Sequence, residues 1–345
     1  MTDPLLTHRV ESWRFDLLSR TEAPLSGPAG LAGVQPGGSV SWNATATFPA
    51  RGEIEVADLG QVADWLDLRI RVWQQVVGAE PWPLGTFCVT GFPERVTSTG
   101  RSWRLTLTDK LIRLDQDGIA ETLALPAGTV VTSAVRAQIA AAGEASVAVT
   151  DSTKTLSTGK VWEAGTSRLR IINDLLGGIN YWSLRTDRWG RYTAAPYVAP
   201  GDRATVRDLT ADAIVLAEWT REQDVASIPN RVVLVTSGTG DTPGLVSVAE
   251  NNDPADRLSI PNRGVITAPD RSTTVDADSQ ATLDALATRR LADLSAPAGM
   301  RTLAHASVPL DMNDVIAHRG VRGVVQEWSQ RLTTGALMTT TVREL

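Results

Sequence analysis

The chain has 345 residues, 42% of them hydrophobic, and a formal net charge of −6 at pH 7. This length and apolar content allow a sizeable core, which excludes general disorder and predicts two or three compact units. The acidic balance argues against a nucleic-acid-binding protein, because neutralising phosphates requires clustered cations and the sequence shows no such cluster.

The sequence has no run of about 18 apolar residues that could span a bilayer. Residues 1–13 lack the basic and then apolar layout of a signal peptide. We therefore expect a soluble protein that is made in a cytoplasm and has no stable membrane association. The one cysteine, Cys88, excludes an intramolecular disulfide, and its neighbours Phe87 and Val89 predict a small buried hydrophobic side chain.

The first 110 residues alternate apolar and polar positions at the period of a half-buried strand. The pattern predicts strands at residues 10–17, 40–48, 68–74 and 87–89, and a hairpin at residues 95–107 that turns at Ser98-Thr99-Gly100. A loop rich in Gly and Pro separates the first two strands. Residues 1–110 are therefore predicted to form an antiparallel β-barrel.

Helical signals begin after residue 110. Thr132 and Ser133 are expected to cap a helix at residues 134–142 that Gly143 ends. A second helix is predicted at residues 167–176, where four apolar side chains share one face, and a hairpin follows at residues 181–194. These signals predict an inserted α+β domain at residues 111–200.

Strand patterns return beyond Pro200. Strands are predicted near residues 231–236, 264–267, 302–308, 321–328 and 337–342, with one helix at residues 279–293 between Asp278 and Pro297. Residues 201–345 are therefore predicted to form a second β-barrel domain with one helix. The predicted fold class is mainly β with an α+β insertion: two antiparallel β-barrels plus an inserted helix-containing domain. Residues 95–100 and 331–335 resemble each other as closing Thr-Gly hairpins, a weak sign of duplication.

Few residues suggest catalysis. His8, His305 and His318 are far apart, and none has a partner at a metal-ligand spacing, which favours solvated or packing roles. No Gly-x-Ser-x-Gly elbow is present, and no histidine lies near Cys88 in the sequence. We predict no catalytic, cofactor-binding or metal-binding residues, no cofactor, and no enzymatic activity.

Other acidic and glycine-rich segments also have structural interpretations. Asp115 and Asp117 precede a glycine as in a calcium loop, but the later acidic ligand is missing, so a surface turn is favoured. The loop at residues 238–244 lacks the Gly-Lys-Ser/Thr of a phosphate-binding loop and is interpreted as a hairpin loop. Two pairs of acids could serve a glycosidase but are more typical of caps and solvated faces. They are Glu53 with Glu55, and Asp276 with Asp278.

Three stretches carry a resemblance to a known family. The first is residues 102–111, the strand that leads from the first barrel into the insertion. The second combines residues 172–176, 180–182, 187–190 and 196–197. The third combines residues 230–233, 282–294 and 309–315. In this order the stretches resemble the tail-tip or baseplate hub proteins of long-tailed bacteriophages, also described as minor tail proteins, which are related to the hubs of contractile injection machines.

The resemblance implies a homotrimer in which two similar barrels per chain form a pseudo-sixfold ring. Such a ring adapts the sixfold tail tube to the threefold tip and lets DNA pass in transit. The implied location is the virion tail tip. The implied partners are other copies of the chain, the distal tail protein or tail tube, the tape measure protein, and other tail-tip or receptor-binding proteins. No functional residue is carried over. The 345 residues show no peptidase or lysozyme-like sequence, so we expect another protein to cut the cell wall.

Other functions remain open. A distal tail ring subunit is the nearest alternative within the same class. The eleven Trp residues, against three Tyr and four Phe, also suggest a carbohydrate-binding β protein, because aromatic faces stack on sugar rings. That function requires several exposed Trp side chains on one face. A hydrolase would require a spatial cluster of acids and histidine.

Overall fold

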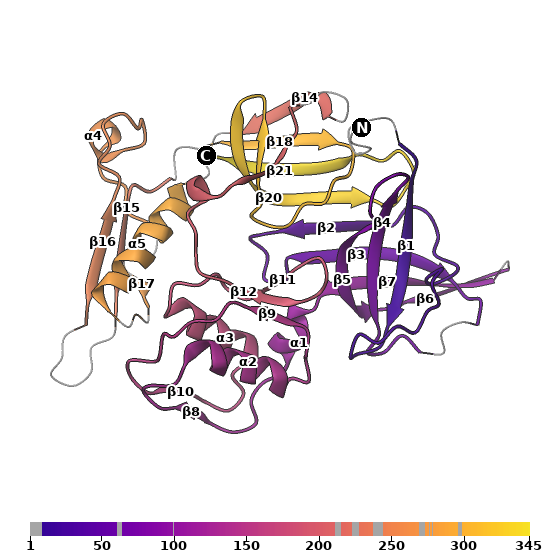
Figure 1. Cartoon of the computed structure of the whole chain (residues 1–345), viewed down its shortest axis with the longest axis horizontal. Coiled ribbons are helices and arrows are strands. Elements are labelled where there is room, and N and C mark those ends of the chain that lie inside the picture. Colours follow the sequence, from indigo (N-terminus) through magenta and orange to yellow (C-terminus); the bar gives the residue numbers. More distant parts are fainter. Residues whose placement is uncertain are drawn as a thin grey trace.

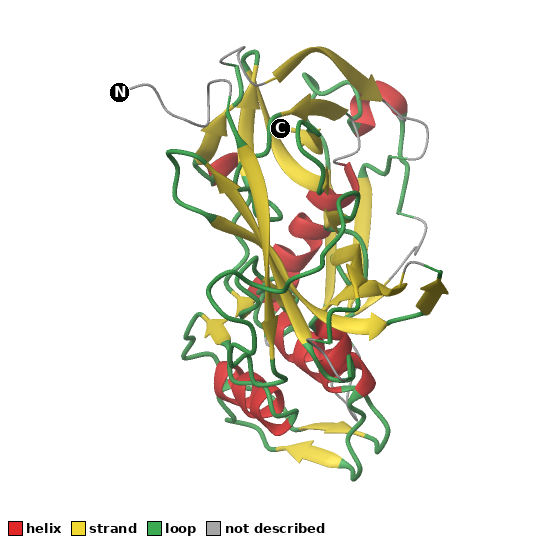
Figure 2. Ribbon diagram, turned by 90° about the vertical axis from the view of Figure 1, so that its right-hand side faces the viewer, coloured by secondary structure: helices red, strands yellow, loops and turns green. Residues whose placement is uncertain are grey.

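The computed structural model describes residues 9–60, 64–98, 100–210, 215–222, 228–236, 244–268, 273–275, 277, 279–295 and 299–345. The fold is mainly β, as the sequence predicts, and one large curled sheet dominates it (Figures 1 and 2). Two smaller units, each with its own core, lie beside this sheet. Within the described ranges, no helix is both long and apolar enough to cross a membrane.

The large sheet has thirteen strands and joins the two ends of the chain. Its main path runs β1 (Glu11–Leu18), β4 (Arg69–Val76), β5 (Trp82–Gly91), β7 (Gly100–Asp109), β3 (Ala50–Ala57), β2 (Ser39–Asn43), β20 (Val321–Arg331), β21 (Met338–Glu344), β18 (Met300–His305) and β14 (Val215–Glu222). Off this path, β6 (Glu94–Thr97) pairs with β7, and β19 (Val315–His318) pairs with β20 and with β13 (Thr205–Asp208). Only the β13–β19 pair is parallel among these strands.

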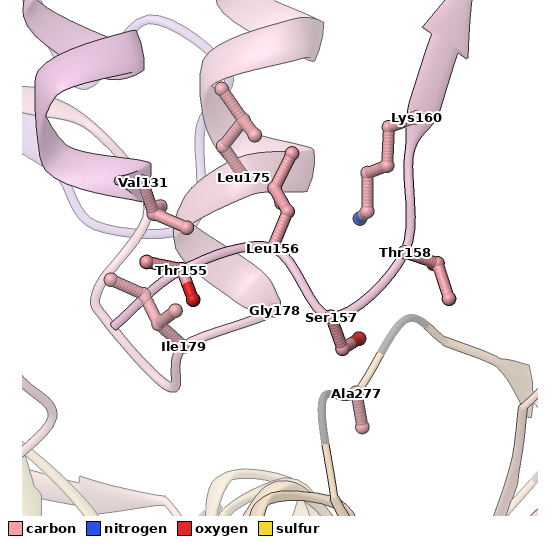
Figure 3. Close-up of a pocket in the computed structure, with 10 residues that line it drawn as sticks. All are labelled: Val131, Thr155, Leu156, Ser157, Thr158, Lys160, Leu175, Gly178, Ile179 and Ala277. Atoms are coloured by element: carbon pink, nitrogen blue, oxygen red, sulfur yellow. The ribbon is translucent and has the colours of Figure 1, made fainter. Parts of the chain in front are cut away.

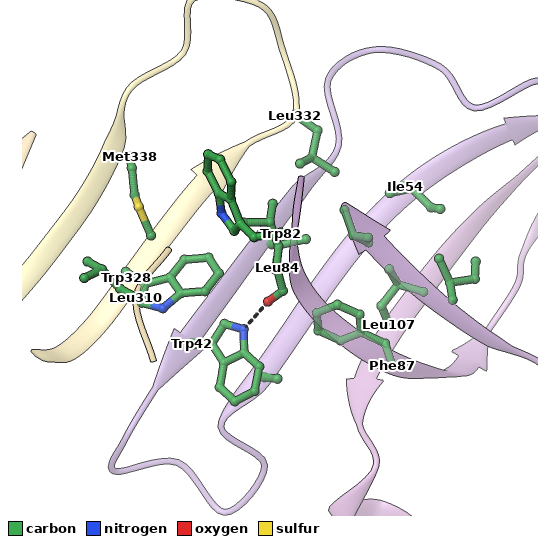
Figure 4. Packing of buried hydrophobic residues seen from close by; sticks show 14 of the residues in the cluster. Trp42, Ile54, Trp82, Leu84, Phe87, Leu107, Leu310, Trp328, Leu332 and Met338 are labelled. Carbon is green, nitrogen blue, oxygen red and sulfur yellow. Dashed lines mark hydrogen bonds between the residues drawn. The ribbon is translucent and has the colours of Figure 1, made fainter. Parts of the chain in front are cut away.

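The step from β2 to β20 connects the N-terminal and C-terminal halves of the sheet. Trp42 stands opposite Trp328 in the antiparallel register, with ring centroids 6.2 Å apart. The Trp42 indole N–H also donates to the Leu84 carbonyl at 2.8 Å (Figure 4). Both indoles are buried, and each removes on the order of 200 Å² of mostly apolar surface from water. The hydrophobic core consequently runs without interruption from one half of the sheet to the other.

The two terminal β regions thus form one curled, largely antiparallel half-barrel with a shared core. The sequence predicts two separate barrels, one at residues 1–110 and one at residues 201–345. The structure supports the mainly β character of both regions. Their division into two barrels stays a prediction.

The middle unit follows directly on β7. It contains α1 (Leu111–Gln116), β8 (Leu123–Leu125), α2 (Val131–Ala141), β9 (Val147–Val149), β10 (Lys160–Trp162), α3 (Arg168–Gly177), β11 (Arg185–Thr186) and β12 (Tyr192–Ala194). Its buried hydrophobic residues come from positions 111–194 and form a cluster separate from the core of the large sheet. A short 3₁₀ turn, η2 (Pro200–Asp202), leads back toward the sheet.

A third unit lies between β14 and β18 in the sequence. Its small sheet contains β15 (Arg231–Val235), β16 (Val246–Glu250) and β17 (Thr273–Thr274), and its helices are α4 (Ile260–Arg263) and α5 (Gln280–Ser295). Leu283, Ala287 and Leu291 on α5 pack against Val232 and Leu234 of β15. The helix predicted at residues 279–293 is therefore present, and it covers this small sheet rather than the large one (Figure 1). Asp278 and Pro297, its expected delimiters, lie outside the described residues.

The two helices predicted for the middle unit are confirmed, but the cap predicted at Thr132 and Ser133 is wrong. Ser167 caps α3, where its side chain accepts the backbone N–H of Arg170 at 3.3 Å. Helix α2 already begins at Val131, and Thr132 lies inside it with its hydroxyl 3.4 Å from the Ser152 backbone. Gly143 follows the helix with a φ of +77°, as expected for a residue that ends one.

A buried network of charges attaches the middle unit to the large sheet. Lys110 and Glu144 are essentially inaccessible to solvent, as is Arg69 of β4. Arg69 and Lys110 both contact Glu22, Arg69 at 2.9 Å. They also both contact Glu144, Lys110 at 3.4 Å. Arg71, which is less buried, also lies 3.5 Å from Glu22, so both carboxylates are surrounded by cations and the rule that buried charges must be paired is satisfied.

Close backbone contacts complete this attachment. The Lys110 ammonium donates to the Gly190 carbonyl at 2.7 Å and lies 4.6 Å from the centre of the Tyr192 ring. Gly190 has a φ of +82°, and a Cβ there would lie 2.7 Å from the Cβ of Thr86 on β5. Only glycine therefore lets the 187–190 turn lie this close to the sheet. The buried Asp109 carboxylate accepts the backbone N–H of Leu111 at 2.9 Å.

We predict that Lys110→Met lowers the free energy of unfolding by about 3–5 kcal/mol, because it removes a fully buried cation that both the Glu22 and Glu144 carboxylates contact. Urea unfolding followed by tryptophan fluorescence measures this change. The matched control Lys154→Met removes an exposed lysine and is expected to change stability by no more than about 0.5 kcal/mol. Adding Glu144→Gln to Lys110→Met should recover part of the loss, since it restores the charge balance. Equal effects of the two lysine substitutions would contradict the role given to the network.

A loop before β19 makes a second polar contact with the middle unit. Asp311 lies 3.5 Å from the Arg188 guanidinium, and the Asp314 carboxylate accepts the backbone N–H of Asp311 at 2.8 Å. Burial raises the pKa of Asp314 to about 6, opposed by this hydrogen bond. Burial raises the pKa of Asp311 as well, although the positive charge of Arg188 counteracts the shift.

The raised pKa of Asp314 makes stability depend on pH in a defined direction. The unfolded side chain has a pKa of about 4, so between about pH 4 and pH 6 the folded state binds more protons and the free energy of unfolding falls as pH rises. Asp314→Asn should remove this contribution. The free energy of unfolding of the variant, relative to that of the wild type, should rise by about 2 kcal/mol as the pH increases from 4 to 7. Urea unfolding at each pH measures this difference. Asp115→Asn, an exposed control on α1, should show no such gain, and a wild-type-like pH profile for Asp314→Asn would refute this assignment.

Candidate functional site

Two of the three histidines are packing residues. His305 is buried, with Nε2 2.8 Å from the Thr340 hydroxyl and Nδ1 2.8 Å from the Ala306 carbonyl. Burial lowers its pKa to about 4. His318 is buried beside Trp219, and its carbonyl accepts a hydrogen bond from Arg301 at 3.2 Å. The prediction of a packing role is confirmed for both, and His8 lies outside the described residues.

Three of the acidic residues considered from the sequence have structural partners, and Asp115 is exposed on α1. Asp117 pairs with Arg168 at 2.6 Å. On β3, Glu53 pairs with Arg104 at 2.6 Å and Glu55 accepts from the Ser102 hydroxyl at 2.8 Å. Asp276, Asp278 and residues 238–243 lie outside the described residues. No group of three or more His, Cys, Asp or Glu side chains within the described ranges could hold a metal ion.

Cys88 is buried in β5, as the sequence predicts. Its side chain is inaccessible to solvent and has no disulfide partner. Burial raises the pKa of the thiol, so the reactive thiolate is disfavoured. Cys88 thus acts as a small core residue.

Most of the Trp side chains are buried or half-buried. All eleven lie within the described ranges: five are buried, five are half-buried, and Trp189 is exposed by 40%. Trp189 packs edge-on against Trp73, with ring centroids 5.4 Å apart. A sugar-binding platform needs several exposed aromatic faces on one surface, and this chain presents one exposed Trp. The arrangement therefore disfavours the carbohydrate-binding alternative.

A small cavity lies between the middle unit and the segment that precedes α5. Its volume is about 40 Å³, and Figure 3 shows Leu156 and Leu175 on one side, with Ser157 toward Ala277. A space of this size holds a few water molecules. It is too small for an organic cofactor or substrate.

A larger cleft of about 510 Å³ lies where the three units meet. The loop between β2 and β3, the middle unit, α5 and β21 all contribute to its lining. We call it the central cleft. Its ionisable lining residues are Arg185, Arg289, Arg290, Asp293 and Arg343.

Aromatic rings organise the guanidinium groups beside this cleft. Those of Arg203 and Arg289 each lie 4.9 Å from the centre of the Trp182 ring, and that of Arg185 lies 5.7 Å away. Arg289 also lies 4.6 Å from the centre of the Tyr197 ring. Stacking on aromatic faces stabilises guanidinium groups that have been partly removed from water.

The sequence did not predict this arginine cluster. Arg185, Arg203, Arg289 and Arg343 are scattered over 159 positions, so no local motif unites them. The expectation that the chain lacks clustered cations is therefore corrected by the structure, which gathers them at the meeting point of the three units. The excess of Arg over Lys was the one visible signal, and composition alone cannot place side chains together.

No protein-family model matches the sequence, and a search of curated proteins finds no match. Solved structures do match over nearly the whole chain. A tail protein from Neisseria meningitidis has a TM-score of 0.66 at 12% identity and covers 97% of both chains. A 43 kDa prophage tail protein from Shewanella oneidensis has a TM-score of 0.62 at 10% identity, covering 95% of this chain and 97% of the other.

A prophage tail protein from Listeria monocytogenes gives a third match. Its TM-score is 0.56 at 12% identity, and the match covers 96% of this chain and 94% of that protein. Because these identities are low, the likeness concerns the fold. The chain has the fold of bacterial and prophage tail proteins over almost its entire length.

Proposed function

We propose that this chain is a structural protein of a bacteriophage tail and acts as the hub at the tail tip. One observation carries the proposal: the fold matches a tail protein over 97% of both chains, so all three units are matched together. The hub assignment itself depends on the resemblance of the three sets of short stretches described above, the first of them residues 102–111, to hub proteins. The residue chemistry agrees with a structural role, since the buried charges are used to attach one unit to another.

The large sheet offers a surface for assembly at its β14 edge. Among the described strands, β14 pairs only with β18, so its other side faces no described strand. Leu216 is 50% exposed there, beside a shallow hollow of about 530 Å³ that Trp219 and Leu303 also line. Open strand edges with apolar side chains favour pairing with another chain. We assign this edge to the contact between copies of the protein.

Three copies joined head to tail by such a contact would close a ring. Each copy would contribute two β domains, divided at the β2–β20 step, so that six such domains surround the axis. Residues 1–110 and 201–345 would supply these two β domains, and residues 111–200 the inserted domain between them. The ring would thereby adapt a sixfold tail tube to a threefold tip.

DNA would pass through this ring without binding to it. The net charge of −6 favours repulsion of the DNA backbone, and we expect acidic or neutral side chains to line the channel. The proposed partners are the distal tail protein or tail tube, the tape measure protein, and other tail-tip or receptor-binding proteins. The proposed location is the virion tail tip, after synthesis in the bacterial cytoplasm.

A distal tail ring subunit is the second candidate, because the fold alone does not separate two tail components. The two functions predict different symmetry. A hub forms a trimer, whereas a distal ring that matches the tail tube forms a hexamer. The oligomeric state of the purified protein therefore discriminates between them.

We predict a homotrimer in mass photometry and light scattering at micromolar concentration. Leu216→Glu should shift the protein to the monomer, because it places a charge on the proposed β14 contact. Val248→Glu is the matched control: Val248 is 52% exposed on β16 in the third unit, and the variant should remain trimeric. A hexamer would favour the distal ring. A monomer both in solution and in the mature tail would overturn the hub assignment.

A further inference from the structure

The central cleft concentrates positive charge that its own residues do not neutralise. Four of its five ionisable lining residues are arginines, and one, Asp293, is a carboxylate. Asp293 lies 3.7 Å from Arg289 and also attracts Arg343, so one carboxylate of the lining is shared between these two arginines. The carboxylates of Asp311 and Asp314, on the neighbouring loop, attract the Arg185 guanidinium electrostatically. Asp311, however, is already paired with Arg188.

Burial makes this imbalance costly. Desolvation lowers the pKa of Arg185, Arg203, Arg289 and Arg343, which shows that the surroundings oppose the charged forms. Arginine nevertheless stays protonated in proteins, since its intrinsic pKa is above about 12. The positive charges must therefore be compensated by something other than loss of a proton.

Three buried polar atoms beside the cleft also lack a hydrogen-bond partner among the described residues. They are Arg185 Nη1, Arg343 Nε and the Tyr197 hydroxyl. Other donors of the cluster are used: Arg203 donates to the Asn313 carbonyl at 2.8 Å, and Arg289 donates to the Tyr181 carbonyl at 2.8 Å. Buried donors without acceptors destabilise a fold unless a ligand or water supplies the acceptor.

We propose that the central cleft is a binding site for a small multivalent oxyanion of the phosphate class. Guanidinium groups form paired hydrogen bonds with phosphate oxygens, and these bonds are strong because both partners are charged. A cleft of about 510 Å³ accommodates a free phosphate or a small phosphorylated molecule, whereas duplex DNA, about 20 Å wide, does not fit. The bound anion would contact the middle unit, α5 and β21 at once and so hold the three units together.

The test compares thermal unfolding of the full chain in inorganic phosphate and in chloride at matched ionic strength. We expect a saturable rise in Tm of several degrees in phosphate, with one site per chain in isothermal titration calorimetry. Arg343→Gln and Arg289→Gln should each weaken phosphate binding at least tenfold. The matched control Arg331→Gln, which removes an exposed arginine of β20, should bind as the wild type does.

Phosphate also stabilises many proteins by exclusion from their surface, and the variants separate that effect from binding. In phosphate-free buffer Arg343→Gln should keep or raise the Tm, because it removes a buried uncompensated charge. A phosphate-dependent rise that persists unchanged in both cleft variants would overturn the proposal, as would the absence of a calorimetric signal. A short single-stranded oligonucleotide that displaces phosphate would identify nucleic acid as the source of the oxyanion. No displacement would identify free phosphate as that source. The result is independent of the tail-tip assignment.

Discussion

The pairing of β2 with β20 is the contact on which the rest of the structure depends. Five residues of β2 align with residues 327–331, and this register joins the first 110 residues to the last 50 in a single sheet. The stacked Trp42 and Trp328 make a slip by one position costly, because it would turn both indoles out of the shared core. The two strands lie far apart in the sequence, so bringing them together has a large entropic cost. We therefore expect this pair to form after the local hairpins.

Once the sheet is closed, polar contacts fix the middle unit on it. The unit leaves the sheet at Asp109 and Lys110, and these two residues also carry the buried hydrogen bonds and ion pairs of the junction. Such contacts depend strongly on direction and distance, whereas hydrophobic burial does not. These polar contacts therefore fix the orientation of the middle unit relative to the large sheet.

The sequence predicted elements well where the pattern was local and periodic. The alternation at Val40 and Trp42, the helix at residues 167–176 and the helix end at Gly143 were each visible from neighbouring residues. Strand β3 and helix α1 were missed: β3 carries Glu53 and Glu55 on its outer face, and α1 has six residues, too few for a periodic signal. The pairing of β2 with β20 and the arginine cluster could not be foreseen, since both depend on residues that meet only after long-range folding.

The distribution of charge separates two kinds of junction in this protein. At the sheet, Arg69 and Lys110 meet Glu22 and Glu144, and the chain neutralises its own charges. At the central cleft, Arg185, Arg289 and Arg343 meet Asp293 alone in the lining. A self-neutralised junction is stable from the moment of folding, whereas one with excess charge gains stability only when an anion arrives. If the central cleft binds an anion, as proposed, the three units have one attachment that forms on folding and a second that strengthens only when the anion is present.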